Sequence, residues 1–127
     1  MDENIAIVRQ VYEAFERQDL EAILNLTHPD CVITQDPTLP WGGTFKGHEG
    51  VTNFAMLLMG TTSSTLTIGE LFEADGKVFE VGRSAGTVNA NGRTFDIPEV
   101  HVWAIKDGKI IEVYFAIDTP AMLAALA

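Results

Sequence analysis

Three turn signals in the second half of the chain constrain its fold more than any other feature. The pairs Asp75-Gly76, Asn91-Gly92 and Asp107-Gly108 follow one another about sixteen residues apart. Such pairs favour tight hairpin turns, because these residue types tolerate the positive φ that the turn requires. The segments between them are rich in threonine and aliphatic residues. The pattern therefore predicts four long strands joined as an antiparallel meander, the last of them over residues 109–117.

The first half of the chain has the period of helices instead. In residues 5–17, apolar side chains recur at three- and four-residue steps and predict one helical stripe: Ile5, Val8, Tyr12 and Phe15. Asp19 can cap a second, short helix, which should end near His28 because a residue before proline avoids the α region. Residues 48–59 predict a third helix with Gly60 as its C-terminal cap.

Helices that precede an antiparallel meander indicate an α+β domain. A short strand over residues 31–35 runs into Asp36-Pro37, and an ordered loop over residues 37–47 leads into the third helix. We expect a strongly curved, mostly antiparallel sheet that wraps around three N-terminal helices as a conical barrel with a deep pocket. The length of 127 residues fits a single domain over residues 1–127.

The charge of the chain argues against several classes of partner. Eight Lys and Arg stand against 18 Asp and Glu, a net charge of −10, which disfavours nucleic acids and anionic membranes. No apolar stretch reaches the ~18 residues of a membrane helix, and the first residues lack the pattern of a signal peptide. Cys31 is the single cysteine, so no internal disulfide is expected. We expect a cytoplasmic protein that acts on a small molecule.

The order of these motifs resembles a known family. The shared motifs are the short helix that opens Asp19-Leu20, the strand that ends Asp36-Pro37, the turn Gly42-Gly43-Thr44-Phe45-Lys46-Gly47, and the meander that ends Asp107-Gly108-Lys109-Ile110. From about residue 4 to 126 the chain resembles the SnoaL-like proteins, a group of the nuclear-transport-factor-two-like, or cystatin-like, cone fold. The resemblance implies that fold. It leaves the activity open, because the superfamily includes polyketide cyclases, ketosteroid isomerases, epoxide hydrolases and non-catalytic pocket proteins.

The resemblance to ketosteroid isomerases makes Asp36 a candidate general base. These enzymes carry such an aspartate at the end of the first strand, also followed by proline. A carboxylate at the rim of a partly dry pocket has a raised pKa and can move a proton between carbon atoms. The alternative is an Asx turn at the start of a loop, which Asp-Pro also indicates.

Residues 97–103 carry the second candidate group. Strand alternation places Glu99, His101 and Trp103 on one face, which we interpret as the wall of a pocket with both polar and apolar side chains. His101 can donate a hydrogen bond to a developing enolate or move a proton, and Glu99 is a possible second acid. The alternatives are a structural histidine bonded to a neighbouring strand or to Tyr114, and an exposed glutamate.

The remaining site predictions concern the lining of the pocket. We expect an apolar ligand to be held by aromatic side chains and one acid: Tyr12, Phe15, Trp41, Phe54, Trp103, Phe115 and Asp118. Tyr12 is displaced by one residue from the catalytic tyrosine of the isomerases, which favours a core or pocket role. Asp118 depends on the turn at Asp107-Gly108. A two-residue turn brings it to the face of His101, whereas a three-residue loop, which we favour, turns it away to cap a short apolar helix that is expected after it.

The sequence lacks the residues that several other reactions require. The last-strand catalytic aspartate of limonene-epoxide hydrolases corresponds to Phe115, and their third-strand pair falls near Gly82 and Ser84. The three histidines, His28, His48 and His101, show no ligand spacing, so no metal or other cofactor is expected. Arg83 could face Glu99 or the solvent, depending on the turn at Asn91-Gly92.

Two functions from different classes follow. The first is a cofactor-independent acid–base enzyme, isomerase-like or cyclase-like, in which Asp36 removes a proton next to a carbonyl of an apolar cyclic compound and His101 stabilises the enolate. The second is a binding module with the same pocket and no turnover. We also expect a homodimer through the outer face of the sheet, because that face exposes an apolar patch: Val100, Val102 and Ala104, with Ile110 and Ala116 alongside.

Overall fold

The computed structural model describes residues 2–127 and contains four helices and six strands. The helices are α1 (Asp2–Glu16), α2 (Leu20–Asn25), α3 (Gly47–Thr61) and α4 (Thr119–Leu126). The strands are β1 (Thr27–Gln35), β2 (Gly43–Lys46), β3 (Thr62–Ala74), β4 (Lys77–Val88), β5 (Thr94–Lys106) and β6 (Lys109–Ile117). Among the described residues, no helix combines the length and the apolar character that crossing a membrane would need.

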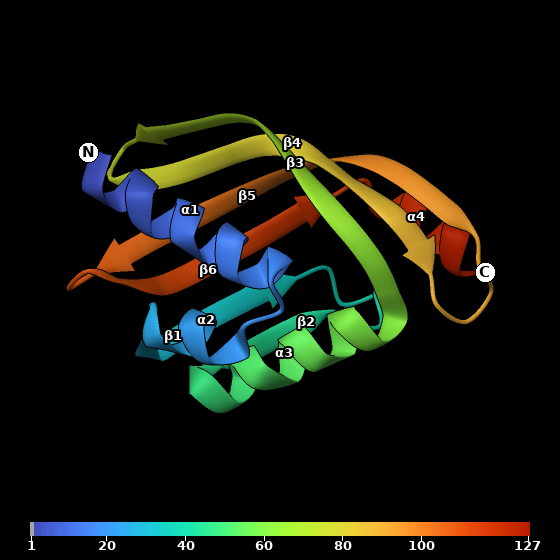
Figure 1. Cartoon of the computed structure of the whole chain (residues 1–127), viewed down its shortest axis with the longest axis horizontal. Coiled ribbons are helices and arrows are strands. Elements are labelled where there is room, and N and C mark those ends of the chain that lie inside the picture. The colour runs from blue at the N-terminus through green and yellow to red at the C-terminus, as the bar shows by residue number, and fades with distance from the viewer. Residues whose placement is uncertain (1) are drawn as a thin grey trace.

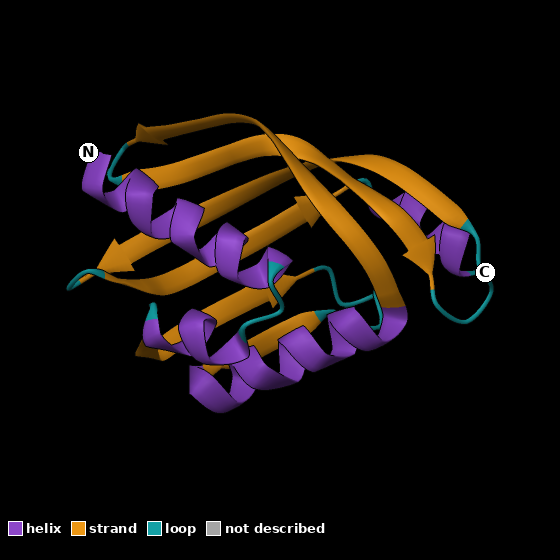
Figure 2. Cartoon of the chain, in the orientation of Figure 1, coloured by secondary structure: helices purple, strands orange, loops and turns teal. Residues whose placement is uncertain are grey.

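The six strands form one curved sheet in the order β2-β1-β6-β5-β4-β3. All neighbouring pairs are antiparallel except β1 and β6, which run in the same direction. The sheet curves around α1, α2 and α3, and it stays open with β2 and β3 as its edges (Figures 1 and 2). The predicted α+β architecture, with helices first and a meander after them, is confirmed.

Two of the three predicted turns are two-residue hairpin turns. Asp75 and Gly76 both have positive φ, at 52° and 75°, and so do Asp107 and Gly108, at 54° and 75°. The turn at Asn91-Gly92 differs, because the last paired residues of β4 and β5 are Thr87 and Thr94. The chain makes a longer loop there, in which the amide N–H of Gly92 donates to the carbonyl oxygen of Val88 at 2.8 Å.

The hairpin of β5 and β6 corrects our preferred interpretation of its turn. Lys106 pairs with Lys109, so the turn has two residues, and not the three that we favoured. A bulge follows at once, because Ile105 pairs with Ile110 while Ala104 pairs with Glu112. The extra residue in β6 reverses the facing of the rest of the strand. Phe115 and Val113 therefore share a face with His101 and Trp103, as the three-residue loop would also have placed them.

The N-terminal half differs from expectation in three places. The helix α2 ends at Asn25, short of His28, and β1 begins at Thr27 rather than at residue 31. The loop predicted over residues 37–47 contains β2, which pairs antiparallel with the end of β1. The third helix continues through Gly60 to Thr61, so Gly60 is a helical residue and not the C-terminal cap. The core lies between the concave face of the sheet and the helices, and its largest members include Trp41, Phe54 and Trp103.

Candidate active site

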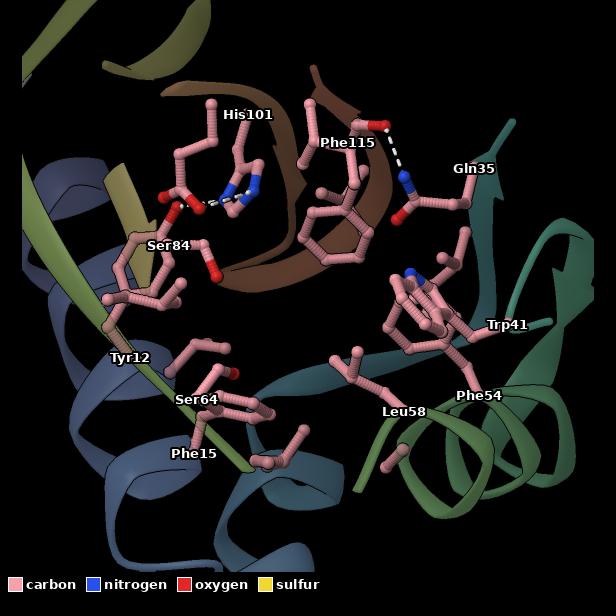
Figure 3. A pocket seen from close by; sticks show the side chains of 18 of the residues that line it. Tyr12, Phe15, Gln35, Trp41, Phe54, Leu58, Ser64, Ser84, His101 and Phe115 are labelled. Carbon is pink, nitrogen blue, oxygen red and sulfur yellow. Dashed lines mark hydrogen bonds and ion pairs between the residues drawn. The ribbon is translucent and has the colours of Figure 1, made fainter. Parts of the chain in front are cut away.

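A cavity of about 120 Å³ lies between the concave face of the sheet and the helices α1 and α3. Its lining is mainly aliphatic and aromatic, and it includes all six aromatic residues that we predicted: Tyr12, Phe15, Trp41, Phe54, Trp103 and Phe115. Protein cavities of roughly this size accept one aromatic ring. Figure 3 shows the cavity between a polar group of side chains around His101 and the indole of Trp41 on the other side.

Strand alternation explains how the polar group comes to face the cavity. On β5, the side chains of Glu99, His101 and Trp103 point inward and are at most 5% exposed. Across the sheet, His101 pairs with Phe115 of β6 on one side and with Glu80 of β4 on the other. Glu80 is completely buried. The predicted face of residues 97–103 is therefore the inner one.

A chain of short contacts joins three of these side chains. The indole N–H of Trp103, which can only donate, donates to the hydroxyl oxygen of Tyr12 at 3.0 Å. The same oxygen lies 2.8 Å from Nδ1 of His101 (Figure 3). Tyr12 projects from α1 and Trp103 and His101 from β5, so these contacts hold the helix against the sheet. The partner that we considered for a structural His101, Tyr114, is 48% exposed and lies on the opposite face of the sheet.

Two buried carboxyl groups flank the imidazole of His101 on opposite sides. Oε1 of Glu80 lies 3.4 Å from Nδ1, and Oε1 of Glu99 lies 3.5 Å from Nε2. Burial raises the pKa of Glu99 to about 9, with Glu80 adding to the rise, and burial also raises the pKa of Glu80. Burial lowers the pKa of His101 to about 3 and raises that of Tyr12 far above its usual value. Neutral forms of Glu99, His101 and Tyr12 are therefore favoured at neutral pH.

The structure places Asp36 outside the cavity lining. Its carboxylate accepts hydrogen bonds from the hydroxyl of Thr38 at 2.6 Å and from the amide N–H of Thr38 at 2.9 Å. These two hydrogen bonds hold the pKa of Asp36 below its usual value. The reason is strand alternation, because Gln35, the last residue of β1, takes the inward position and lines the cavity. This is the Asx turn of our alternative interpretation, and it gives no support to Asp36 as the general base.

Asp118 is also absent from the cavity lining. It is the N-cap of α4, and its carboxylate accepts a hydrogen bond from the amide N–H of Ala121 at 3.1 Å. The predicted pocket position of Asp118 is thus corrected in favour of the capping role. Arg83 points to the solvent, where its Nε lies 2.8 Å from Oδ1 of Asp96.

Sequence reasoning missed several inward-facing polar residues, of which Glu80 and Gln35 have the largest polar groups. Glu80 shares the inward face of β4 with Val78, which is fully buried. Our expectation of no metal rested on histidine spacing alone. The structure brings one ligand atom from each of Glu80, Glu99 and His101 within 4.8 Å of one another. This cluster is part of the candidate site.

Comparisons with known proteins place this geometry in a family. A model described as the SnoaL-like domain matches residues 8–113. No curated protein matches the sequence significantly. Among solved structures, a protein of unknown function with the nuclear-transport-factor-two-like fold, from Burkholderia pseudomallei, is 30% identical with a TM-score of 0.91. The aligned region covers 100% of this chain and 99% of that one.

Two further similar structures are of proteins that carry names. TerC, co-crystallised with polyporic acid, is 26% identical with a TM-score of 0.88, and the match covers 98% of each chain. IdmH from Streptomyces antibioticus, described as a proposed polyketide cyclase, is 25% identical with a TM-score of 0.79, over 95% of this chain and 96% of that one. The family model spans most of the chain, and the fold agrees along its whole length. The chain therefore belongs to the SnoaL-like family.

Proposed function

We propose that this protein is a cofactor-independent acid–base enzyme that isomerises or cyclises a small apolar carbonyl compound with one ring. The observation that carries the proposal is the placement of Glu99 and His101 in the wall of an otherwise apolar, aromatic-lined cavity. The size of that cavity, about 120 Å³, favours a single ring. An apolar wall strengthens each polar contact inside it, because water is excluded.

The two groups have complementary roles. Glu99, held in its acid form by burial, donates a hydrogen bond to the carbonyl oxygen of the substrate. Nε2 of His101 removes a proton from the carbon next to that carbonyl, and an enol forms as Glu99 transfers its proton to the oxygen. In an isomerisation, His101 returns the carbon-bound proton to a different carbon while Glu99 recovers its own. In a ring closure, the enol carbon attacks a second carbonyl group of the same molecule. His101 gives its proton to the oxygen of that group, and Glu99 recovers its own as the first carbonyl re-forms.

Two of the similar structures support a small organic ligand for this fold. TerC was crystallised with polyporic acid, and IdmH is described as a proposed cyclase. In this chain the base is His101 rather than Asp36, because the carboxylate of Asp36 is engaged by Thr38 outside the cavity.

The test uses a β,γ-unsaturated cyclohexenone, whose conversion into its conjugated isomer is followed by ultraviolet absorbance. We expect Glu99→Gln and His101→Phe each to lower kcat/KM by roughly a hundredfold or more. Asp36→Asn is the matched control, because it removes a carboxylate near the site that does not line the cavity. It should keep the wild-type rate.

Two outcomes would contradict the proposal. Loss of activity in Asp36→Asn alone would return the role of base to Asp36. Saturable binding of the ketone by all variants, with isomerisation no faster than in buffer, would show the non-catalytic binding module that we considered as the alternative.

A further inference from the structure

We propose that Glu80 and Glu99 hold a single proton between them, placed on Glu99, so that the ionised carboxylate of Glu80 orients His101. Glu80 is then a positioning residue that acts through the imidazole and does not touch the substrate. The part that this pair plays in turnover rests on the proposed function, whereas its protonation does not.

The first argument is the hydrogen-bonding capacity of the imidazole. A neutral imidazole has one N–H donor and one acceptor nitrogen. The two carboxyl groups lie at opposite ring nitrogens of His101, Glu80 at Nδ1 and Glu99 at Nε2. A carboxylate is therefore the better neighbour of the ring nitrogen that carries hydrogen, and a carboxylic acid is the better neighbour of the other nitrogen. Both preferences are met when the pair carries one proton, and only one of them is met when the pair carries two or none.

The second argument decides which carboxyl group holds the proton. The hydroxyl oxygen of Tyr12 has two lone pairs, of which one accepts from the indole of Trp103. If Nδ1 of His101 carries hydrogen, it donates to the other lone pair at 2.8 Å and also faces Glu80. If Nδ1 were the acceptor, the Tyr12 hydroxyl and an acidic Glu80 would compete for one lone pair. In the first arrangement the hydroxyl of Tyr12 donates its own hydrogen to the carboxylate of Glu80, with which it is hydrogen-bonded, so no donor is left unused. Before substrate binds, the lone pair of Nε2 then faces Glu99 in its acid form.

The third argument is the lack of any other neutralising group. Both oxygens of Glu80 and Oε2 of Glu99 are buried, and the polar groups that Glu80 meets are Glu99 and the hydroxyl of Tyr12. No lysine or arginine is among the described residues that line the cavity. The titratable groups that face the pair are Tyr12 from α1 and His101 from β5, and β6 presents the apolar ring of Phe115. A fully ionised pair would be two adjacent buried charges without a counter-ion, which burial strongly disfavours.

A metal ion is the competing way to satisfy these oxygens. The ligand atoms of Glu80, Glu99 and His101 lie within 4.8 Å of one another. The two carboxyl groups, however, approach different nitrogens of one ring, and Tyr12 already contacts Nδ1. An ion bound at Nδ1 would have to displace the hydroxyl of Tyr12, which lies 2.8 Å from that nitrogen. The geometry therefore favours a proton over a metal.

The experiment measures protonation directly, in the full-length protein at neutral pH. Infrared difference spectroscopy with labelled glutamate should show one carboxylic acid C=O band. That band should vanish in Glu99→Gln and persist in Glu112→Gln, which changes an exposed glutamate of β6. Nitrogen NMR of the imidazole should show hydrogen on Nδ1 of His101. In Glu80→Gln the hydrogen should stay on Nδ1, because the amide oxygen can accept from it as the carboxylate does.

The pH profile tests the positioning role. In Glu80→Gln, the pH at which Glu99 loses its proton should fall by about one unit or more, because a neighbouring negative charge is gone. The alkaline limb of kcat/KM should fall with it. An infrared band that survives in Glu99→Gln, or no band at neutral pH in the wild type, would overturn the inference. Elemental analysis that finds one divalent metal per chain in the wild type would assign the cluster to a metal instead. If no ketone is turned over, the infrared and NMR outcomes still decide the protonation.

Discussion

Tyr12 connects the helix α1 to the polar group of the cavity. Its hydroxyl contacts both the indole N–H of Trp103, at 3.0 Å, and Nδ1 of His101, at 2.8 Å. Removal of the hydroxyl in Tyr12→Phe leaves a buried indole N–H without its acceptor. We expect the free energy of unfolding to fall by about 1–3 kcal/mol, as for other buried donors that lose a partner. Urea denaturation of the purified protein measures this change.

The matched control is Tyr114→Phe. Tyr114 is 48% exposed on the outer face of the sheet, so its hydroxyl is solvated. Removal of that hydroxyl leaves no buried polar group without a partner. At chain concentrations below those at which the proposed dimer forms, its loss should change the free energy of unfolding by less than about 0.5 kcal/mol. Equal effects of the two substitutions would show that the contacts of Tyr12 do not contribute to stability.

The opposed pKa shifts of Glu99 and His101 predict how stability depends on pH. The pKa of Glu99 rises from 4.5 to about 9 on folding, so its contribution is full below pH 4.5 and is lost as the pH rises toward 9. The pKa of His101 falls from 6.5 to about 3, so stability is lost as the pH falls from 6.5 toward 3. Together the two groups place a maximum near pH 5.5, where the slopes cancel.

Thermal denaturation between pH 4 and pH 9, at constant ionic strength, measures this dependence. The variant Glu99→Gln cannot lose a proton at this position, so its stability should decline less on the alkaline side of the maximum. The acid side should be unchanged, because it belongs to His101. An unchanged alkaline decline in Glu99→Gln would assign that decline to other groups.

The inward face of β5 could be predicted from sequence, but that of β4 was not. On β5, Glu99, His101 and Trp103 alternate with Val100 and Val102, and the predicted pocket wall is the observed one. On β4, large apolar side chains lie on both faces, because Phe79 and Val81 point outward while Val78 points inward. Alternation then marks no face as the inner one. Glu80 was missed for this reason.

Asp36 shows the opposite error, because it was predicted as a site residue and does not line the cavity. Its position after the first strand matched the isomerase pattern, but the facing of a strand end depends on pairing with distant strands. Gln35 pairs with Phe115 of β6 and donates its side-chain N–H to the carbonyl oxygen of Phe115 at 3.1 Å. That pairing turns Gln35 inward and leaves Asp36 to the loop. The residues next to Asp36 in the sequence do not predict this pairing.

The hairpin of β5 and β6 shows why the type of a turn is harder to predict than the face of the sheet on which the following side chains lie. A three-residue loop, and a two-residue turn followed by a bulge, place the same side chains on the same face. The expectation for Phe115 was therefore correct although the turn was wrong. The two alternatives differ at Ile110, which lies before the bulge. The two-residue turn pairs it with Ile105 on the inner face, where it is 2% exposed, and not on the outer face as we predicted.

Gly82 of β4 provides a test of the packing between β3, β4 and the cluster. A Cβ atom at this position would overlap the carbonyl oxygen of Thr67 in β3 and Oε2 of Glu80. We expect Gly82→Ala to lower the free energy of unfolding by about 1–3 kcal/mol, because neither the strand nor the buried carboxyl group can move freely. Urea denaturation measures the loss, and a shifted pH profile should accompany it.

Gly60 of α3 is the matched control for this substitution. Its Cβ position has no neighbour within 4 Å, and it lies inside the helix. Gly60→Ala should raise the free energy of unfolding by about 0.5–1 kcal/mol, because alanine loses less conformational freedom in a helix. A loss of stability in Gly60→Ala similar to that in Gly82→Ala would refute the steric explanation.

The architecture of the whole molecule was predictable to different depths in its two halves. The meander of β3 to β6 follows from turns between neighbouring segments, and the residue types at these turns predict them. The parallel pairing of β1 with β6 joins segments about eighty residues apart, as in the pair Ile33 and Val113. Hydrophobic periodicity carries no information about such distant partners, and the four-residue β2 was too short to be distinguished from a loop.

The outer face of the sheet carries an exposed apolar patch that crosses four strands. Its members are Phe72 and Phe79, which stack at 5.5 Å, with Val81, Val100, Val102, Tyr114 and Ala116 beside them. Four of these side chains are at least 39% exposed: Phe72, Val81, Val100 and Tyr114. Contiguous apolar patches of this kind are rare on monomers. We propose that two copies of the chain pair through this face, which agrees with the expected homodimer except for the buried Ile110.

A charge in the centre of this patch should separate the two copies. Val100 pairs with Val81 on one side and with Ala116 on the other, so it lies in the middle of the patch. In Val100→Lys, two like charges would be brought together and dehydrated at the centre of a two-fold interface, which strongly disfavours association. Sedimentation equilibrium at micromolar concentration should give twice the chain mass of 13.9 kDa for the wild type and the single mass for the variant. Met56→Lys is the matched control, because Met56 is 63% exposed on α3, away from the sheet face, and its substitution should leave the dimer intact. A wild-type protein of single mass, or a Val100→Lys variant that remains dimeric, would exclude this face as the interface.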